Sequence, residues 1–147
     1  MKSRTLSATT MILLAPLVVL AFQAQAEQVR SRELKNKSFT AGSLKITLTR
    51  FFSNNYASDQ SIIYIEVENT SGDITTFVPQ LLTFIDKDDN QVDIVGQYVG
   101  YGGHLVAAGD KRVWPKARIK HRYLLADKVR LPARLYYEDK LLATIIE

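Results

Sequence analysis

Short segments in which apolar and polar side chains alternate constrain the fold of this chain more than any other feature. In residues 44–50 every second side chain is apolar, and in residues 61–69 Ile63, Ile65 and Val67 share one face. A period of two residues is the pattern of a strand with one buried face and one wet face. Similar strand segments are expected at 81–86, 91–95, 117–125, 133–137 and 141–146. Since no stretch of ten residues after residue 26 carries a helical stripe, the sequence predicts an all-β domain.

The first 26 of the 147 residues have the features of an export signal. Lys2 and Arg4 supply positive charge, residues 11–22 are apolar, and Ala24-Gln25-Ala26 offers the small side chains that a signal peptidase requires. The apolar stretch is shorter than the roughly 17–25 residues that cross a bilayer. The pattern therefore predicts cleavage before Glu27, a periplasmic or secreted protein, and no transmembrane segment after cleavage.

The composition of the remaining chain is that of one globular domain. Removal of 26 residues leaves 121 (147 minus 26), and the whole sequence is 46% hydrophobic and 23% charged, which excludes a disordered polyelectrolyte. There is no cysteine, so disulfides, thiolate chemistry and lipid attachment through a processed cysteine are excluded. Residues 27–40 are polar and lack an apolar period, so we expect a flexible N-terminal arm ahead of a domain at 41–147.

The number and spacing of the strands favour one fold class. Seven to eight short strands separated by turn signals, in a chain of this size, are typical of an antiparallel immunoglobulin-like β-sandwich. A small barrel is the second interpretation.

Three segments resemble landmarks of a known family. Residues 63–71, residues 82–86 with the hairpin tip at 88–90, and residues 108–110 are similar to segments of the uncharacterised bacterial extracellular immunoglobulin-like family. That family is similar in fold to a secreted mycobacterial immunoprotective antigen. The resemblance implies the fold and export, and it brings no reaction and no catalytic residues.

Positive charge is concentrated in the last third of the sequence. Loss of Lys2 and Arg4 reduces 19 basic residues to 17 against 15 acidic ones, so the net charge after cleavage is only +2. Residues 111–134 nevertheless hold nine bases and one acid. With a period of two, one face of this segment carries Lys116, Arg118, Lys120 and Arg122.

Such a row of cations has three interpretations. Glu66 and Glu68 alternate on another strand and are candidates for cross-strand ion pairs with it. Cations along an edge strand also prevent pairing with other chains. The functional interpretation is an anionic surface or an acidic envelope protein as partner. Nucleic acid fits poorly, because export removes the usual target and no aromatic side chains are interleaved with the cations.

A glycine-rich segment at 96–104 is a second candidate contact region. Tyr98, Tyr101 and His104 place flat amphipathic rings on a glycine frame, which suits binding to a sugar or a protein. The structural alternative is that the tyrosines cover one end of the sandwich. Trp114, beside Pro115, is either a plug at the rim of the core or an exposed anchor for a partner.

Residues that could support catalysis or bind a metal are few. His104 and His121 lie on separate expected elements and form no ligand motif. The sequence therefore predicts a non-enzymatic exported domain without a cofactor that binds an envelope or extracellular component, through Lys116, Arg118, Lys120, Arg122, Tyr98, Tyr101, His104 and Trp114. The alternatives are a purely structural or assembly module, and a metal-binding protein or hydrolase that uses His104 and His121. The oligomeric state is left open by the sequence.

Overall fold

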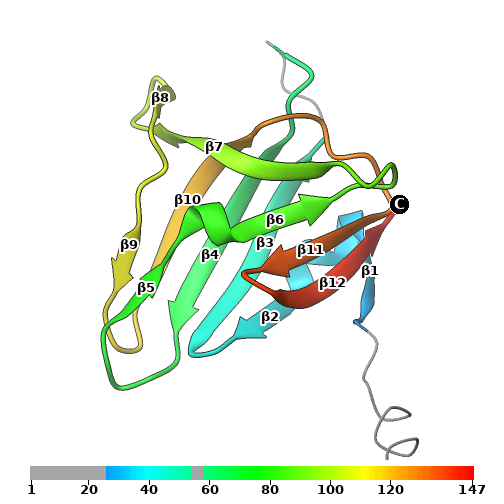
Figure 1. The fold of residues 1–147 in the computed structure, drawn as a ribbon. Helices are drawn as coiled ribbons and strands as arrows, with labels where there is room; N and C mark the ends of the chain where they lie inside the picture. The colour runs from blue at the N-terminus through cyan, green and yellow to red at the C-terminus, as the bar shows by residue number, and fades with distance from the viewer. Residues whose placement is uncertain (1–25, 54–57) are drawn as a thin grey trace, which may run out of the picture.

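The computed structural model describes residues 26–53 and 58–147, and most of them lie in strands (Figure 1). The strands are β1 (Gln28–Arg30), β2 (Ser38–Ala41), β3 (Leu44–Phe52), β4 (Ile62–Asn69), β5 (Thr75–Phe77), β6 (Leu82–Ile85), β7 (Gln91–Val99), β8 (His104–Val106), β9 (Lys111–Val113), β10 (Arg118–Leu125), β11 (Ala133–Tyr137) and β12 (Lys140–Ile146). Two short 3-10 helices are η2 (Ser31–Asn36) and η3 (Pro79–Leu81). The expected all-β class is confirmed. The leader expected at 1–26 lies, except for Ala26, outside the described residues.

Most of the strands belong to one curled sheet that forms a half-barrel (Figure 1). Its order is β1-β12-β11-β6-β7-β10-β4-β3-β2, and β8 adds to β7. The sheet is mixed, because β1 runs parallel to β12 while the other neighbours are antiparallel. Strands β5 and β9 pair with each other as a separate two-stranded sheet.

Strand β7 joins the two halves of this sheet. Its first residues pair with β6, and its last residues pair with β10. The register shifts between Leu124, opposite Gly96, and Leu125, opposite Ile94, so Val95 is an extra residue on β7. A bulge of this kind bends a strand and increases its twist. In place of the two separate antiparallel layers of the expected sandwich, the strands therefore form one continuous curled sheet.

The core lies on the concave side of the half-barrel. Its fully buried side chains come from strands of both halves and include Ile46, Leu48, Ile63, Ile65, Val67, Phe84, Leu135 and Ile145. Phe77 of β5 stacks on Tyr137 of β11, with ring centroids 5.7 Å apart, and its ring lies 6.4 Å from that of Tyr123 on β10. The small β5–β9 sheet thus packs between the two halves and covers part of the core.

The segment expected to be a flexible arm, 27–40, is instead built into the fold. Strand β1 pairs with β12, β2 pairs with β3, and Val29, Leu34 and Phe39 are buried. These three apolar side chains lie among polar neighbours, and η2 interrupts the two-residue period between them. The sequence pattern therefore did not indicate that the segment packs against the core.

Candidate binding surface

The cationic strand β10 occupies the middle of the half-barrel. It pairs with β4 on one side and with β7 on the other. The pairing with β7 begins at Arg122, so Arg122 is internal and does not protect an edge. Arg118 and Lys120 lie on the part of β10 that pairs with β4 alone in the described residues, where the interpretation as edge protection still applies. Its polar face lies on the convex side of the sheet, opposite the core residues of the same strands.

One row of side chains crosses this convex face at Arg122. In the strand register Arg122 lies opposite Tyr64 of β4 and opposite Tyr98 of β7, and Arg50 of β3 lies on the far side of Tyr64. Side chains opposite one another on a sheet are close enough to interact directly. The row Arg50, Tyr64, Arg122 and Tyr98 thus alternates cations with aromatic rings across four strands.

The contacts along this row are cation–π contacts. The guanidinium carbon of Arg122 lies 4.6 Å from the ring centroid of Tyr98 and 5.8 Å from that of Tyr64, and that of Arg50 lies 5.5 Å from Tyr64. Arg122 Nη1 also donates to Tyr64 Oη at 3.4 Å. These contacts hold Arg122 in place without neutralising its charge.

A shallow hollow of about 540 Å³ lies over this row. Its lining includes Tyr64, Tyr98, Tyr101, Lys120 and Arg122. Within the described part of the chain, no ion pair joins Lys120 or Arg122 to a carboxylate. Lys120 lies opposite Glu66 of β4, but the ion pair of Glu66 is with Arg118. The hollow therefore combines two cations that form no ion pair with three amphipathic rings.

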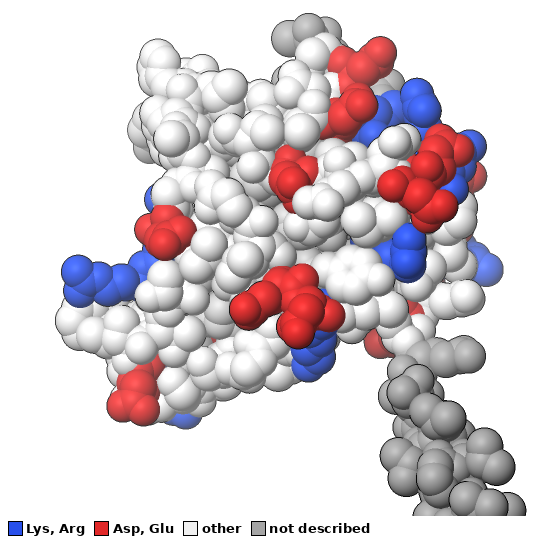
Figure 2. Space-filling view, in the orientation of Figure 1, with Lys and Arg blue, Asp and Glu red and all other residues white. Residues whose placement is uncertain are grey.

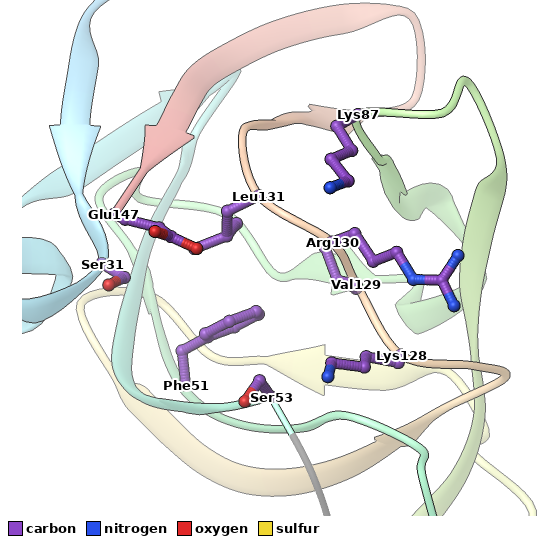
Figure 3. Close-up of a pocket in the computed structure, with 9 residues that line it drawn as sticks. All are labelled: Ser31, Phe51, Ser53, Lys87, Lys128, Val129, Arg130, Leu131 and Glu147. Carbon is purple, nitrogen blue, oxygen red and sulfur yellow. The ribbon is translucent and has the colours of Figure 1, made fainter.

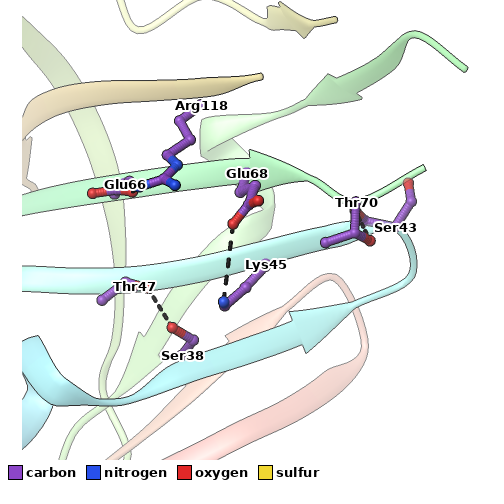
Figure 4. A network of polar contacts seen from close by, with 8 residues as sticks. All are labelled: Ser38, Ser43, Lys45, Thr47, Glu66, Glu68, Thr70 and Arg118. Atoms are coloured by element: carbon purple, nitrogen blue, oxygen red, sulfur yellow. Dashed lines mark hydrogen bonds and ion pairs between the residues drawn. The ribbon is translucent and has the colours of Figure 1, made fainter. Parts of the chain in front are cut away.

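The other half of the same face is electrically balanced (Figure 4). Arg118 Nη1 lies 3.3 Å from Glu66 Oε1, and Lys45 Nζ lies 3.9 Å from Glu68 Oε2. Lys116 is not on the strand face as predicted, because its φ of 63° places it in the preceding turn, where Nζ donates to the carbonyl of Thr70. Of the four predicted cations, two are satisfied internally and two face the hollow.

The glycine-rich segment forms the hairpin between β7 and β8 beside the hollow. Tyr98 lies on β7, Tyr101 is fully exposed in the turn, and His104 is exposed at the start of β8. Gly103 has a φ of +67°, and a Cβ there would lie 3.0 Å from Arg122 Nη2. The left-handed φ favours glycine at this position, and the short distance shows that the hairpin lies against the Arg122 guanidinium.

Trp114 lies apart from these residues. It precedes β10 in the turn from β9 and is 61% exposed, so it is not a plug of the core. It does not line the hollow.

The two histidines are not brought into one site. His121 Nδ1 lies 2.9 Å from Gln97 Nε2, and partial burial, together with the positive charge of Lys111, lowers its pKa. Among residues 26–53 and 58–147, no three His, Asp or Glu side chains are arranged to hold a metal ion. Beside His121, burial raises the pKa of Tyr123, whose Oη has no hydrogen-bond partner in the described residues. This cluster provides neither a metal site nor a nucleophile with its base.

A second hollow, of about 490 Å³, lies between the β10–β11 connection and the end of β3 (Figure 3). Its lining includes Lys87, Lys128, Arg130, Phe51, Leu131 and Glu147. Arg130 Nη1 lies 3.5 Å from Asp88 Oδ2, and Glu147 adds a further negative charge. The positive charge of this second hollow is therefore partly balanced by Asp88 and Glu147, whereas Lys120 and Arg122 in the first hollow form no ion pair in the described residues.

Four of the predicted contact residues line the hollow, namely Tyr98, Tyr101, Lys120 and Arg122, whereas Tyr64 and the neighbouring Arg50 were not among the predicted contacts. Tyr64 lies on the polar face of its strand, the face that Glu66 and Glu68 share. The two-residue period places Tyr64 and Arg122 each on the polar face of its own strand. Only the register of β4 and β10 shows that the two residues lie opposite each other.

No family model and no curated protein matches this chain. Among solved structures, the chain is similar to the crystal structure of the yjhA protein from Bacillus subtilis, with a TM-score of 0.49 and 14% sequence identity. The similarity covers 78% of this chain and 85% of that chain. A likeness at this level says nothing about function. None of the helices in the described residues is long and apolar enough to cross a membrane.

Proposed function

We propose that this protein is a non-enzymatic binding domain that recognises an anionic component of the cell envelope or its surroundings through the hollow over Tyr64, Tyr98 and Arg122. The observation that carries the proposal is the division of charge on one sheet face. Arg118 is ion-paired with Glu66, whereas Lys120 and Arg122 form no ion pair in the described residues, although Lys120 lies opposite Glu66 in the strand register. An anion bound there gains charge-assisted hydrogen bonds without displacing an existing ion pair.

The aromatic rings give the site more than charge. Tyr64 and Tyr98 flank the Arg122 guanidinium, and Tyr101 stands exposed beside it. Rigid amphipathic rings bind with little loss of conformational entropy and tolerate both polar and apolar groups. The ligand that fits is an anion attached to a larger organic framework.

Export is part of the proposal. It is supported by the pattern of residues 1–26 and by the resemblance of three segments to the bacterial extracellular immunoglobulin-like family. The immunoglobulin-like relationship itself is proposed on the same resemblance. An exported domain meets anionic glycans, lipids and acidic proteins rather than nucleotides.

The test measures how long the protein is retained on immobilised heparin, a lipid-free polyanion, during a salt gradient. The variant Lys120→Gln/Arg122→Gln removes the two cations of the hollow. The control Arg112→Gln/Lys116→Gln removes the same charge from the same basic segment, at two positions that do not line the hollow and form no ion pair in the described residues. We expect the first variant to elute at distinctly lower salt and to bind about tenfold more weakly, a difference of about 1.4 kcal/mol.

The comparison has a clear negative outcome. If both variants elute at the same salt concentration as each other, retention reflects net charge alone and the hollow is not the site. That result would favour the alternative of a structural or assembly module, in which the polar side chains of the convex face only keep that side of the sheet hydrated.

A further inference from the structure

The hairpin beside the hollow carries no formal charge. Residues 94–109 contain no Asp, Glu, Lys or Arg over 16 positions, the longest such run after the leader. In the ribbon the β7–β8 hairpin stands away from the body of the molecule, and the space-filling view shows no charged atoms over it (Figures 1 and 2). The rest of the face drawn in Figure 2 carries both acidic and basic side chains, so the uncharged hairpin stands out from it.

Apolar side chains of this hairpin face solvent. Leu105 is 53% exposed and Val106 is 43% exposed, while Val99 and Tyr101 are exposed as well. Leu105 lies over Gly96, whose Cβ would be 2.7 Å from Leu105 Cδ1, so the side chain is held on the hairpin surface. Among the described strands β8 pairs with β7 alone, and it lacks the lysine or proline that usually protects an exposed edge. Leu105 and Val106 are consecutive in β8 and project from opposite faces, so the hairpin exposes apolar side chains on both faces. Exposed apolar groups on a projecting hairpin mark an interaction surface.

Positive charge lies immediately below this apolar tip. Gly103 of the hairpin approaches Arg122 Nη2, and Lys120 and Tyr101 line the same hollow. The acids closest in sequence, Asp93 and Asp110, lie at the two ends of the uncharged run and not within it. Apolar groups at a tip with cations behind them match a membrane surface, in which acyl chains lie beneath anionic headgroups.

We infer that the anionic component is a phospholipid bilayer, and that the β7–β8 hairpin enters its interface with Tyr101, Leu105 and Val106 while Lys120 and Arg122 bind headgroup phosphates. The inference rests on the proposed function, because it uses the same two cations. Binding to a bilayer also requires the exposed apolar side chains of the hairpin, which binding to a soluble polyanion does not need. Interfacial insertion combines both contributions, since each alone gives only weak attachment.

The experiment is co-sedimentation of the protein with vesicles of phosphatidylcholine that contain phosphatidylglycerol, compared with vesicles of phosphatidylcholine alone. The variant Tyr101→Ser/Leu105→Ser removes one aromatic and one aliphatic side chain from the tip. The control Trp114→Ser/Ile74→Ser removes the same two kinds of exposed side chain near the β5–β9 pair. We expect wild type and control to bind the anionic vesicles, and the hairpin variant to bind them about tenfold more weakly.

Parallel measurement on heparin separates the two proposals. A second hairpin variant, Leu105→Ser/Val106→Ser, changes no residue that lines the hollow, so it is expected to keep wild-type retention on heparin and to bind anionic vesicles more weakly. Absence of binding to anionic vesicles, combined with heparin retention that depends on Lys120 and Arg122, would overturn the lipid inference and leave the proposed function standing. Absence of both would overturn both. Three further results would contradict insertion of the hairpin. The first is that the protein binds neutral vesicles as well as anionic ones, and the second is that the Trp114→Ser/Ile74→Ser control loses as much vesicle binding as the hairpin variant. The third is that the protein forms a dimer in solution that Tyr101→Ser/Leu105→Ser dissociates.

Discussion

At the scale of single residues, the environment of a side chain decides what the same chemical group contributes. Arg118 and Arg122 are four residues apart on one strand face, but Arg118 has a carboxylate within 3.3 Å and Arg122 has two tyrosine rings. The first pair is exposed and adds little to stability. The second arrangement leaves the positive charge available. Sequence alternation placed both on the same face, and only the neighbouring strands distinguish them.

Two buried tyrosines give a matched test of this principle. The Tyr123 hydroxyl has no partner in the described residues, whereas Tyr137 Oη accepts a hydrogen bond from the Val78 backbone at 3.0 Å. We expect Tyr123→Phe to leave the free energy of unfolding unchanged or to raise it by up to about 1 kcal/mol, because it removes an unsatisfied buried hydroxyl. Tyr137→Phe should lower that free energy by about 1–3 kcal/mol, because it leaves the Val78 N–H without its partner.

Urea denaturation of both variants measures the two values under identical conditions. A substantial loss of stability in Tyr123→Phe would show that its hydroxyl is bonded in solution. Equal effects of the two substitutions would contradict the assignment of their hydrogen bonds.

At the scale of elements, local pattern predicted the strands better than their partners. The alternation in residues 44–50 and 61–69 corresponds to β3 and β4, and the predicted strands at 133–137 and 141–146 correspond to β11 and β12. The pairing of β10 between β4 and β7 depends on contacts between residues far apart in the chain. A two-residue period carries no information on such partners, so the curled sheet and the internal position of the cationic strand were not predicted.

The N-terminal segment shows the same limit and permits a direct test. Leu34 of η2 is 1% exposed and belongs to the core cluster. We expect Leu34→Ala to lower the free energy of unfolding by about 2–4 kcal/mol, since it deletes buried methyl groups and leaves a cavity. Glu33→Ala, at an exposed position of the same helix, should change it by less than about 0.5 kcal/mol. Equal small effects of the two substitutions would indicate that the segment is a loosely attached arm after all.

At the scale of the whole molecule, charge is segregated rather than excessive. The net charge of +4 falls to +2 when Lys2 and Arg4 are removed, so general attraction to anions is weak. What distinguishes the molecule is one face with two cations outside any ion pair of the described residues, next to an uncharged hairpin. The concentration of bases in residues 111–134 led to the prediction of an anionic partner, but the grouping of Tyr64, Arg122 and Tyr98 could be seen only in the assembled sheet.

The proposed route out of the cell is also a property of the whole chain. When the complete sequence is produced in a bacterial host, we expect protein in the periplasmic fraction or medium to begin at Glu27, as measured by intact mass and N-terminal sequencing. The variant Ala26→Trp should retain residues 1–26, because a signal peptidase requires a small side chain before the cleaved bond. Recovery of wild-type protein with Met1 intact from the cell interior would contradict export.

The parallel pairing of β1 with β12 has a consequence for the order of events in synthesis. Gln28 lies beside Thr144, so the strand made first docks on the strand made last. Until the ribosome has delivered both, the edge that receives β1 does not exist, and contacts this distant in sequence form slowly. The nascent polypeptide therefore lacks this pairing until β12 has been synthesised.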